Sequence, residues 1–276
     1  MGLRINTNIA SQEVQKNLRA NSAQQEAEFA KLSSGKRITK SADDAAGLAI
    51  AKKLEANTRG LRVASRNAND AISLVQVAEG GLNETSNILT RLRELSIQAG
   101  SDTVGEKERS YLSMEYEQLV AEADRISKTT TFNGRPLLKG EGDMMQFQVG
   151  SQAGEDHRIE FDAGATDATS ENLGISGTNV REKEAALDNL SAIDSAIEKI
   201  SGFRANFGAV QSRLQTSINN LEIQVVNEEG ARSRIEDVDV ADATAKIASA
   251  QIKGAAGIAT LAQANELGQG ALRLIG

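Results

Sequence analysis

The segment that follows Gly60 carries the pattern that most constrains the fold. Small and apolar residues recur there at spacings of three and four over four heptads: Ala71, Leu74, Ala78, Gly81, Thr85, Ile88, Leu92, Leu95 and Ala99. This spacing is typical of a long helix that packs along a partner helix. Gly80 and Gly81 each cost about 1 kcal/mol relative to alanine inside a helix, and we attribute both to close packing. Gly100 is expected to end the helix.

A second long pattern supplies the partner helix. From about residue 180, apolar residues again follow helical spacing, at Leu187, Leu190, Ile193, Ile197, Ile200, Phe207, Val210, Leu214, Leu221 and Val225. A shorter helix is predicted from about 106 to 128. Aromatic residues make up only 3% of the chain and Pro136 is the single proline, which favours elongated helices over a thick globular core. We predict a mainly α fold of long, hairpin-shaped coiled-coil helices.

The middle of the chain changes period from helical spacing to alternation. Phe147 and Val149 alternate with polar residues, a glycine-containing turn follows, and Ile159 and Phe161 alternate again. This pattern indicates a β-hairpin. Residues 162–178 are rich in Gly, Ala, Thr and Ser and are predicted to form a surface loop. A short β-hairpin region is therefore expected at about 140–178.

The two ends of the chain are only weakly amphipathic. Residues 5–33 and 240–275 carry a few apolar residues among many small and polar ones. Neither segment can bury much apolar surface alone. If the chain folds back on itself, these ends meet. We expect them to become ordered only when neighbouring molecules cover them.

The stretch "SSGKRITKSADDAAGLAIA" at 33–51 combines a Gly-Lys pair with two adjacent aspartates, which could indicate a phosphate or metal site. A P-loop requires a glycine where Ala30 stands and a serine or threonine where Arg37 stands, so that motif fails. Two aspartates offer too few oxygen ligands for Ca²⁺. We predict instead a turn between domains, in which Ser-Gly closes one helix and the S-x-x-D stretch from Ser41 starts the next. The turn residues are Ser34, Gly35, Asp43 and Asp44.

No catalytic constellation stands out in the sequence. His157 is the only histidine and is expected on the second hairpin strand, and neither an H-E-x-x-H nor a G-x-S-x-G motif is present. Glu115, Glu117 and Asp124 fit the solvated face of a helix. Arg91 and Glu94 fit an ordinary i,i+3 pair on such a face. We therefore expect no enzyme activity, no cofactor and no metal site.

Charge and hydropathy restrict the partners. A net charge of −7 argues against a nucleic-acid partner. The absence of cysteine excludes disulfides and cysteine nucleophiles. No apolar run approaches the roughly 20 residues that a membrane-spanning helix needs, so no membrane insertion is expected. The N-terminus lacks the apolar core of a secretory signal.

Several motifs, in order from one end of the chain to the other, are similar to those of bacterial flagellins. They are "INTN" at 5–8, "LSSGKRI" at 32–38, "SADDAAGLAIA" at 41–51, "ASRNANDAISL" at 64–74, "RLRELSIQA" at 91–99, "FNG" at 132–134, "RSRIEDVDVADA" at 232–243 and "LAQANELGQGALRLI" at 261–275. The resemblance covers nearly the whole chain. The chain resembles a short form that lacks the large variable outer domains of many relatives.

The resemblance implies a structural subunit of the flagellar filament, which serves swimming motility. The subunit would be exported through the flagellar type III apparatus, and it would be extracellular in the filament. Residues 1–40 and 240–276 would form the terminal helices of the inner tube, and residues 41–239 the outer core domain. The alternative is a flagellar hook–filament junction protein, which usually departs from the "SRNANDAISL" and "LAQAN" patterns kept here.

The resemblance also implies partners and functional residues. The partners are further copies of the chain in a helical homopolymer, an export chaperone, the filament cap, the hook-junction proteins and host Toll-like receptor 5. Receptor recognition would use Arg91, Leu95 and Glu115. Polymerisation would use apolar residues of the terminal helices, namely Val14, Leu18, Phe29, Leu32, Ile258, Leu261, Leu267, Leu272 and Ile275.

Overall fold

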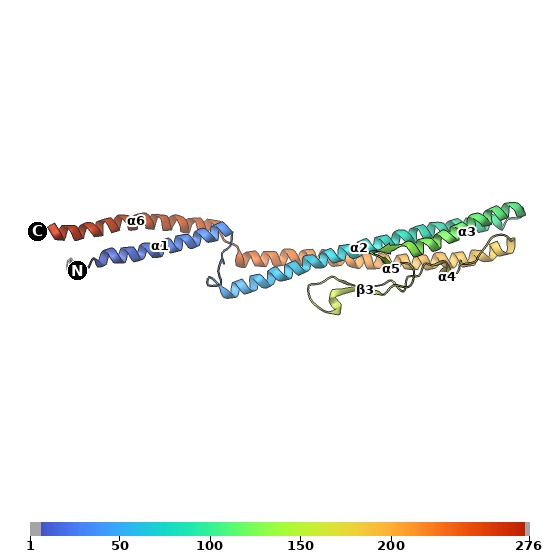
Figure 1. Cartoon of the computed structure of the whole chain (residues 1–276), viewed down its shortest axis with the longest axis horizontal. Coiled ribbons are helices and arrows are strands. Elements are labelled where there is room, and N and C mark those ends of the chain that lie inside the picture. The colour runs from blue at the N-terminus through green and yellow to red at the C-terminus, as the bar shows by residue number, and fades with distance from the viewer. Residues whose placement is uncertain (1–6, 274–276) are drawn as a thin grey trace. The chain divides into compact units, whose positions relative to one another are not determined.

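The fold is mainly α, as predicted, with five long helices and a small β region among the described residues (Figure 1). The computed structural model describes the backbone of residues 7–273 and the side chains of residues 7–266. The helices are α1 (Ile9–Ser34), α2 (Ala45–Ala99), α3 (Glu106–Thr129), α4 (Ser170–Leu173), α5 (Lys183–Glu236) and α6 (Val240–Arg273). The end of α2 at Ala99 confirms the stop predicted at Gly100, whereas α5 continues well past Val225.

Two antiparallel hairpins make up the β region. The first, β1 (Thr131–Phe132) with β2 (Arg135–Pro136), turns at Asn133 and Gly134, which have φ values of 49° and 77°. Two positive φ values are what a tight two-residue hairpin turn requires. The second, β3 (Met144–Gln148) with β4 (Arg158–Asp162), places Phe147 opposite Ile159 and confirms the predicted hairpin. The placement of His157 on the second strand is wrong, because this residue ends the short 3₁₀ helix η1 (Glu155–His157) before that strand.

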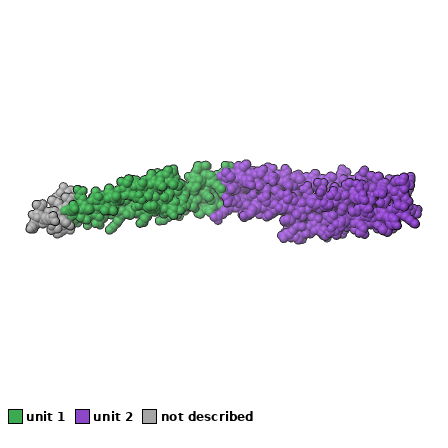
Figure 2. Space-filling model, turned by 90° about the horizontal axis from the view of Figure 1, so that it is seen from above, with its two compact units in different colours: residues 1–56, 227–276 green, residues 57–226 purple. Residues whose placement is uncertain are grey.

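The chain divides into two compact units, coloured separately in Figure 2. Unit 1 comprises residues 1–56 and 227–276, and unit 2 comprises residues 57–226. Unit 1 holds α1 and α6. Unit 2 holds most of α2 and α5, all of α3 and both hairpins.

One large core and a separate, smaller apolar cluster fill unit 2. The seam predicted from the heptads is buried at its leucines and half-buried at Ile88, and Val75, Leu82 and Leu89 extend it. From the other long helix, Ile193, Phe207 and Leu214 enter the same core, and α2 and α5 run side by side (Figure 1). The second hairpin joins this core through aromatic contact, because the rings of Phe161 and Phe207 lie 5.2 Å apart.

Three details of the sequence interpretation are wrong. Leu187, expected in the seam of α5, is 47% exposed, whereas its neighbour Ala186 is buried. Gly80 has no atom within 4 Å of where a Cβ would stand, so close packing accounts only for Gly81. The third concerns residues 162–178, which are not a surface loop. There Thr166, Ala168, Leu173 and Ile175 are buried, and α4 is capped by Thr169.

Unit 1 is built on the pairing of α1 with α6. The side-chain amide of Asn21 donates to the carbonyl of Ala250 at 2.8 Å, and that of Asn8 donates to the carbonyl of Ala264 at 2.9 Å. Gly257 lets Leu18 approach closely, since a Cβ there would stand 2.9 Å from Leu18 Cδ2. These contacts confirm that the two ends of the chain meet.

Candidate functional site

The turn at residues 33–51 is held by its own backbone and carboxylates. Gly35 ends α1 with a φ of 70°, and its N–H and that of Lys36 point back to carbonyls of the last helical turn. Glycine suits this left-handed cap because it has no Cβ. Asp43 Oδ2 accepts three hydrogen bonds at 3.0 Å, from the backbone N–H groups of Lys40 and Thr39 and from the Thr39 hydroxyl. These bonds, led by the one from Lys40, lower the pKa of Asp43.

Asp44, rather than Ser41, starts the next helix. Its Oδ1 accepts the N–H of Gly47 at 2.8 Å, which is the contact that an N-cap residue makes three positions ahead. The expected S-x-x-D start is therefore shifted, because α2 begins at Ala45 and Asp43 is already engaged in the preceding turn. The two adjacent aspartates thus have separate structural tasks, one in the turn and one at the helix start.

The α1–α6 pair leaves apolar side chains on its surface. Phe29 is 46% exposed and Ile258 is 65% exposed. Val14, Leu18, Leu32 and Leu261 are half-buried. A groove of about 290 Å³ runs between the two helices and is lined by Val14, Leu18, Lys253, Gly257 and Thr260 together with two asparagines. The side chains of Leu267 and Leu272, and the whole of Ile275, lie outside the described residues.

Arg91 and Glu115 meet on an exposed face of unit 2. Two guanidinium nitrogens of Arg91 donate to Glu115 Oε1 at 3.0 and 2.8 Å, and a third donates to Glu94 Oε2 at 3.0 Å. The bond to Glu115, followed by that to Glu94, raises the pKa of Arg91. Leu95 is fully buried in the core of unit 2. The structure therefore brings Arg91 and Glu115 together at the surface and places Leu95 beneath it.

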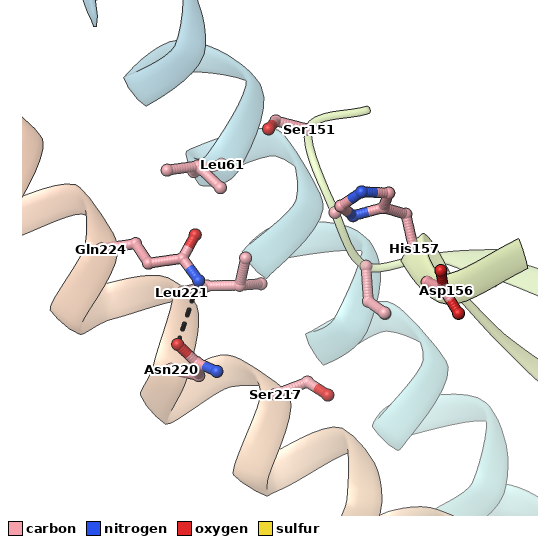
Figure 3. Close-up of a pocket in the computed structure, with 10 residues that line it drawn as sticks. Leu61, Ser151, Asp156, His157, Ser217, Asn220, Leu221 and Gln224 are labelled. Atoms are coloured by element: carbon pink, nitrogen blue, oxygen red, sulfur yellow. Dashed lines mark hydrogen bonds between the residues drawn. The ribbon is translucent and has the colours of Figure 1, made fainter. Parts of the chain in front are cut away.

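A pocket beside the second hairpin contains the only histidine (Figure 3). It has a volume of about 200 Å³, and Ser151, Asp156, His157 and Ser217 are among its lining residues. Serine, histidine and aspartate together are the residue types of a nucleophilic site, which requires hydrogen bonds between their side chains. Among the lining residues, all of which the structure describes, the one hydrogen bond between side chains runs from the Gln224 amide to Asn220 Oδ1. The pocket thus lacks the contacts of a triad.

Within the described part of the chain, no group of three or more histidine, aspartate or glutamate side chains is placed to hold a metal ion. None of its helices combines the length and the hydropathy needed to cross a membrane.

Sequence reasoning missed the contacts between segments that are far apart in the chain. Lys36 and Arg37 bind residues of the last turn of α5, about 200 positions away, and Arg93 Nε donates to Asp194 Oδ1 at 2.7 Å. Helical periodicity reports which face of a helix is buried. It carries no signal for pairs of polar residues at such separations.

Comparisons with known proteins agree with the fold. The model of the bacterial flagellin N-terminal helical region matches residues 5–143, and that of the C-terminal helical region matches residues 190–275. A flagellin of Halalkalibacterium halodurans is 40% identical over 98% of this chain and 99% of its own length. A flagellar filament core protein of Brachyspira hyodysenteriae is 36% identical, again over 98% of this chain and 99% of its own.

Solved structures point the same way. The crystal structure of Bacillus cereus flagellin is 31% identical, with a TM-score of 0.51 over 56% of this chain and 88% of that one. The structure of a putative flagellar hook-associated protein from Vibrio parahaemolyticus is 14% identical, with a TM-score of 0.60 over 71% of this chain and all of that one. At this identity the likeness shows a shared fold alone. The hook–filament junction alternative is therefore no better supported. The chain belongs to the bacterial flagellins, as a short form of these structural, non-enzymatic subunits of the flagellar filament.

Proposed function

We propose that the α1–α6 pair is the surface through which copies of this chain assemble. The observation that carries this proposal is the apolar surface that the pair leaves uncovered. Ile252 and Ile258 on α6 are 71% and 65% exposed, and Ile9 and Phe29 on α1 are 53% and 46% exposed. Burying one such side chain fully contributes about 1.5–3 kcal/mol, so a neighbouring copy that covers several of them gains substantial free energy.

The side chains buried within the pair are mostly small. On α6 they are Ala243, Ile247, Ala250 and Ala264. A pair with so small a core gains little from its own packing, and association with neighbours supplies the remainder. When each copy uses two different surfaces and the rotation between copies does not close, the product is an open helical filament. In this arrangement residues 1–40 and 240–276 form the inner tube, and residues 41–239 form the outer core.

Truncation tests this role. Removing residues 240–276 is expected to leave a soluble monomer whose unit 2 is intact, as judged by circular dichroism. This monomer should no longer form sedimenting filaments after seeding. Ile258→Asp should weaken assembly in the full chain, while Ile258→Leu, which keeps the apolar area, should assemble normally. Filaments of normal length in electron micrographs of the truncated protein would contradict the assignment.

The filament lies outside the cell, and its subunit reaches the distal end through the flagellar type III apparatus. This part of the proposal rests on family membership. The same exposed apolar face of α6 suits binding by an export chaperone before assembly, because a polymerising surface must be covered until then. At the two ends of the filament the subunit meets the cap and the hook-junction proteins. Swimming motility follows from rotation of the assembled filament.

Recognition of the monomer by Toll-like receptor 5 is a second proposed function. The exposed cluster of Arg91, Glu94 and Glu115 supports it, since these charged groups are accessible on adjacent helices and fixed by mutual hydrogen bonds. The exposed fractions of the Arg91 and Glu115 side chains are 48% and 44%. Leu95 acts as a positioning residue, because its buried side chain fixes the helix that carries Arg91.

A reporter-cell assay with depolymerised subunit tests this recognition. Arg91→Ala should lower the response by at least about tenfold, as expected for loss of a charged anchor at an interface. The matched control is Arg125→Ala, which breaks an exposed ion pair with Glu122 on α3 outside the cluster. Equal responses from the two variants would contradict the proposed role of Arg91 in receptor recognition.

A further inference from the structure

The segment between β4 and α5 is anchored in the core of unit 2. We call its residues 167–181 the brace, and they include the short helix α4. Leu173 and Ile175 belong to the core and are at most 2% exposed. The backbone is fixed as well, since the N–H of Ala168 donates to the carbonyl of Leu138 at 2.9 Å. The brace is therefore a packed element rather than a free connection.

The brace runs alongside α3 in the opposite direction. The hydroxyl of Ser170 donates to Asp124 Oδ1 at 3.0 Å, and the N–H of the same serine donates to it at 3.4 Å. Nearer the start of α3, the hydroxyl oxygens of Tyr116 and Thr178 lie 3.0 Å apart. Residue numbers thus rise along the brace while they fall along α3, and the two contacts hold the helix at two levels.

The contact between Tyr116 and Thr178 is buried and directional. Thr178 Oγ1 donates to the carbonyl of Ile175 at 2.7 Å. Since a hydroxyl has one proton to give, the Tyr116 hydroxyl donates to Thr178. Tyr116 is fully buried, and a buried hydroxyl that loses its hydrogen-bond partner destabilises the state that buries it. Thr178 therefore matters to the position of Tyr116.

A third contact between the two elements is exposed. Arg181 Nη2 donates to Glu117 Oε1 at 3.0 Å, and the exposed fractions of the two side chains are 68% and 44%. Surface ion pairs of this kind contribute little. The buried hydroxyl pair is thus the stronger link at this end of the brace.

The other side of the brace is bound to α5. The side-chain amide of Asn189 donates to the carbonyl of Asn179 at 2.7 Å, and Lys199 Nζ donates to the carbonyl of Asn172 at 2.5 Å. The brace therefore connects α3 to α5 through hydrogen bonds on both of its sides.

α3 has little apolar packing of its own to hold it. Among the buried members of the core, Tyr116 is the only residue from α3, all of which the structure describes. Leu112, Leu119 and Val120 pack against the core but are only half-buried. The other buried side chains of α3 are small, namely Ser113, Ala123 and Ser127. By contrast, α2 and α5 supply many large buried residues to one another. α3 is therefore the long helix of unit 2 that depends most on polar contacts.

We propose that Tyr116 is a positioning residue, whose hydroxyl fixes α3 to the brace and so keeps the neighbouring Glu115 beside Arg91. When this contact is lost, α3 detaches locally while α2 and α5 stay paired. Such partial openings require less free energy than global unfolding. The inference concerns the geometry of the exposed charged cluster, and it does not depend on whether that cluster binds a receptor.

Native-state amide hydrogen exchange in depolymerised full-length subunit tests this role. Thr178→Val keeps the shape of the side chain but removes the acceptor. Exchange at residues 112–120 of α3 should become at least about fivefold faster, whereas exchange in the paired parts of α2 and α5 should change less than about twofold. Tyr116→Phe removes the donor and should accelerate exchange in α3 at least about threefold. The double variant should be no faster than Thr178→Val, because both substitutions remove one contact.

Three controls separate the contact from general damage. Thr178→Ser keeps the hydroxyl and should stay within about twofold of the parent. Thr216→Val makes the same chemical change at an exposed hydroxyl, which donates to the carbonyl of Ser212 on α5, and should change exchange in α3 less than about twofold. Arg181→Ala should have an effect below about threefold, as expected for a surface pair.

The outcomes that contradict the role are specific. Equal exchange of α3 in Thr178→Val and Thr216→Val would overturn the proposal, and so would equal acceleration of α2, α3 and α5. A Thr178→Ser variant as fast as Thr178→Val would overturn it too. If Thr178→Val fails to fold, as judged by far-UV circular dichroism, Tyr116→Phe and Thr178→Ser decide the question. Unchanged exchange of α3 in Tyr116→Phe would then refute the positioning role.

Discussion

Replacing each of two adjacent glycines in α2 with alanine should have opposite effects on stability. At Gly80 the added Cβ meets no atom within 4 Å. Alanine there gains helix propensity at no steric cost, so the free energy of unfolding should rise by about 0.5–1 kcal/mol. For a unit of this size, that corresponds to a melting temperature higher by roughly 1–4 °C.

At Gly81 the same substitution meets two neighbours that cannot move away. The added Cβ would stand 2.7 Å from Leu138 Cδ1 and 2.8 Å from Thr130 Oγ1, well inside the roughly 3.5–4.0 Å of a normal carbon contact. Leu138 is fully buried, and the Thr130 hydroxyl is held by the carbonyl of Ile126 at 2.7 Å. Overpacking of this kind costs about 1–3 kcal/mol, which offsets or exceeds the gain in propensity.

The two variants should therefore differ by roughly 1–3 kcal/mol, with Gly81→Ala the less stable. Urea unfolding of depolymerised full-length subunit, followed by far-UV circular dichroism, gives both free energies under the same conditions. Each variant serves as the control for the other, because the residues are adjacent and the chemical change is identical. If Gly81→Ala were as stable as Gly80→Ala, the packing argument for Gly81 would fail.

Three further predictions concern a buried hydroxyl, a helix cap and the core. Burial raises the pKa of Tyr116 above its usual 10.0, so the unfolded chain loses this proton first, and the free energy of unfolding should fall as the pH rises above about 10. Urea unfolding at about pH 8 and about pH 11 should show a smaller loss in Tyr116→Phe, and an equal loss in both proteins would refute the assignment. Asp44→Ala should cost about 1 kcal/mol of local stability at the start of α2; faster amide exchange at Leu48 would show it, and unchanged exchange would contradict the cap. Phe207→Ala should destabilise unit 2 by about 3–5 kcal/mol in thermal unfolding, against less than about 0.5 kcal/mol for the exposed Phe29→Ala.

The sequence predicted what helical and strand periodicity encode. The heptad spacing from Ala71 to Ala99 located the buried seam of α2, and the alternation around Phe147 and Ile159 located the second hairpin with its two strands. Both succeed because an apolar residue repeated at the period of its element has to face a core.

Other features could not be predicted, because composition and local spacing do not indicate which distant residues meet in three dimensions. Residues 162–178 have the composition of a loop, yet Ala168 and Ile175 belong to the buried core of unit 2. Composition alone does not distinguish such a packed irregular segment from an exposed one. Positions 80 and 81 of α2 are both glycine, and only the nearby side chains of Thr130 and Leu138 make Gly81 different from Gly80. The contact of Lys36 with Glu236 depends on the whole chain returning to its start.

The hydrogen bonds of Asn8 and Asn21 restrict the choice of residue on α1 more than on α6. Each asparagine donates to a main-chain carbonyl of α6, a group that every residue carries. At Ala250 and Ala264, which are 4% and 8% exposed, α6 therefore needs only a small side chain, whereas α1 needs the amide itself. Mutational drift is thus freer at these positions of α6 than at their partners on α1. An α6 from a related subunit with different small residues there would still satisfy both asparagines.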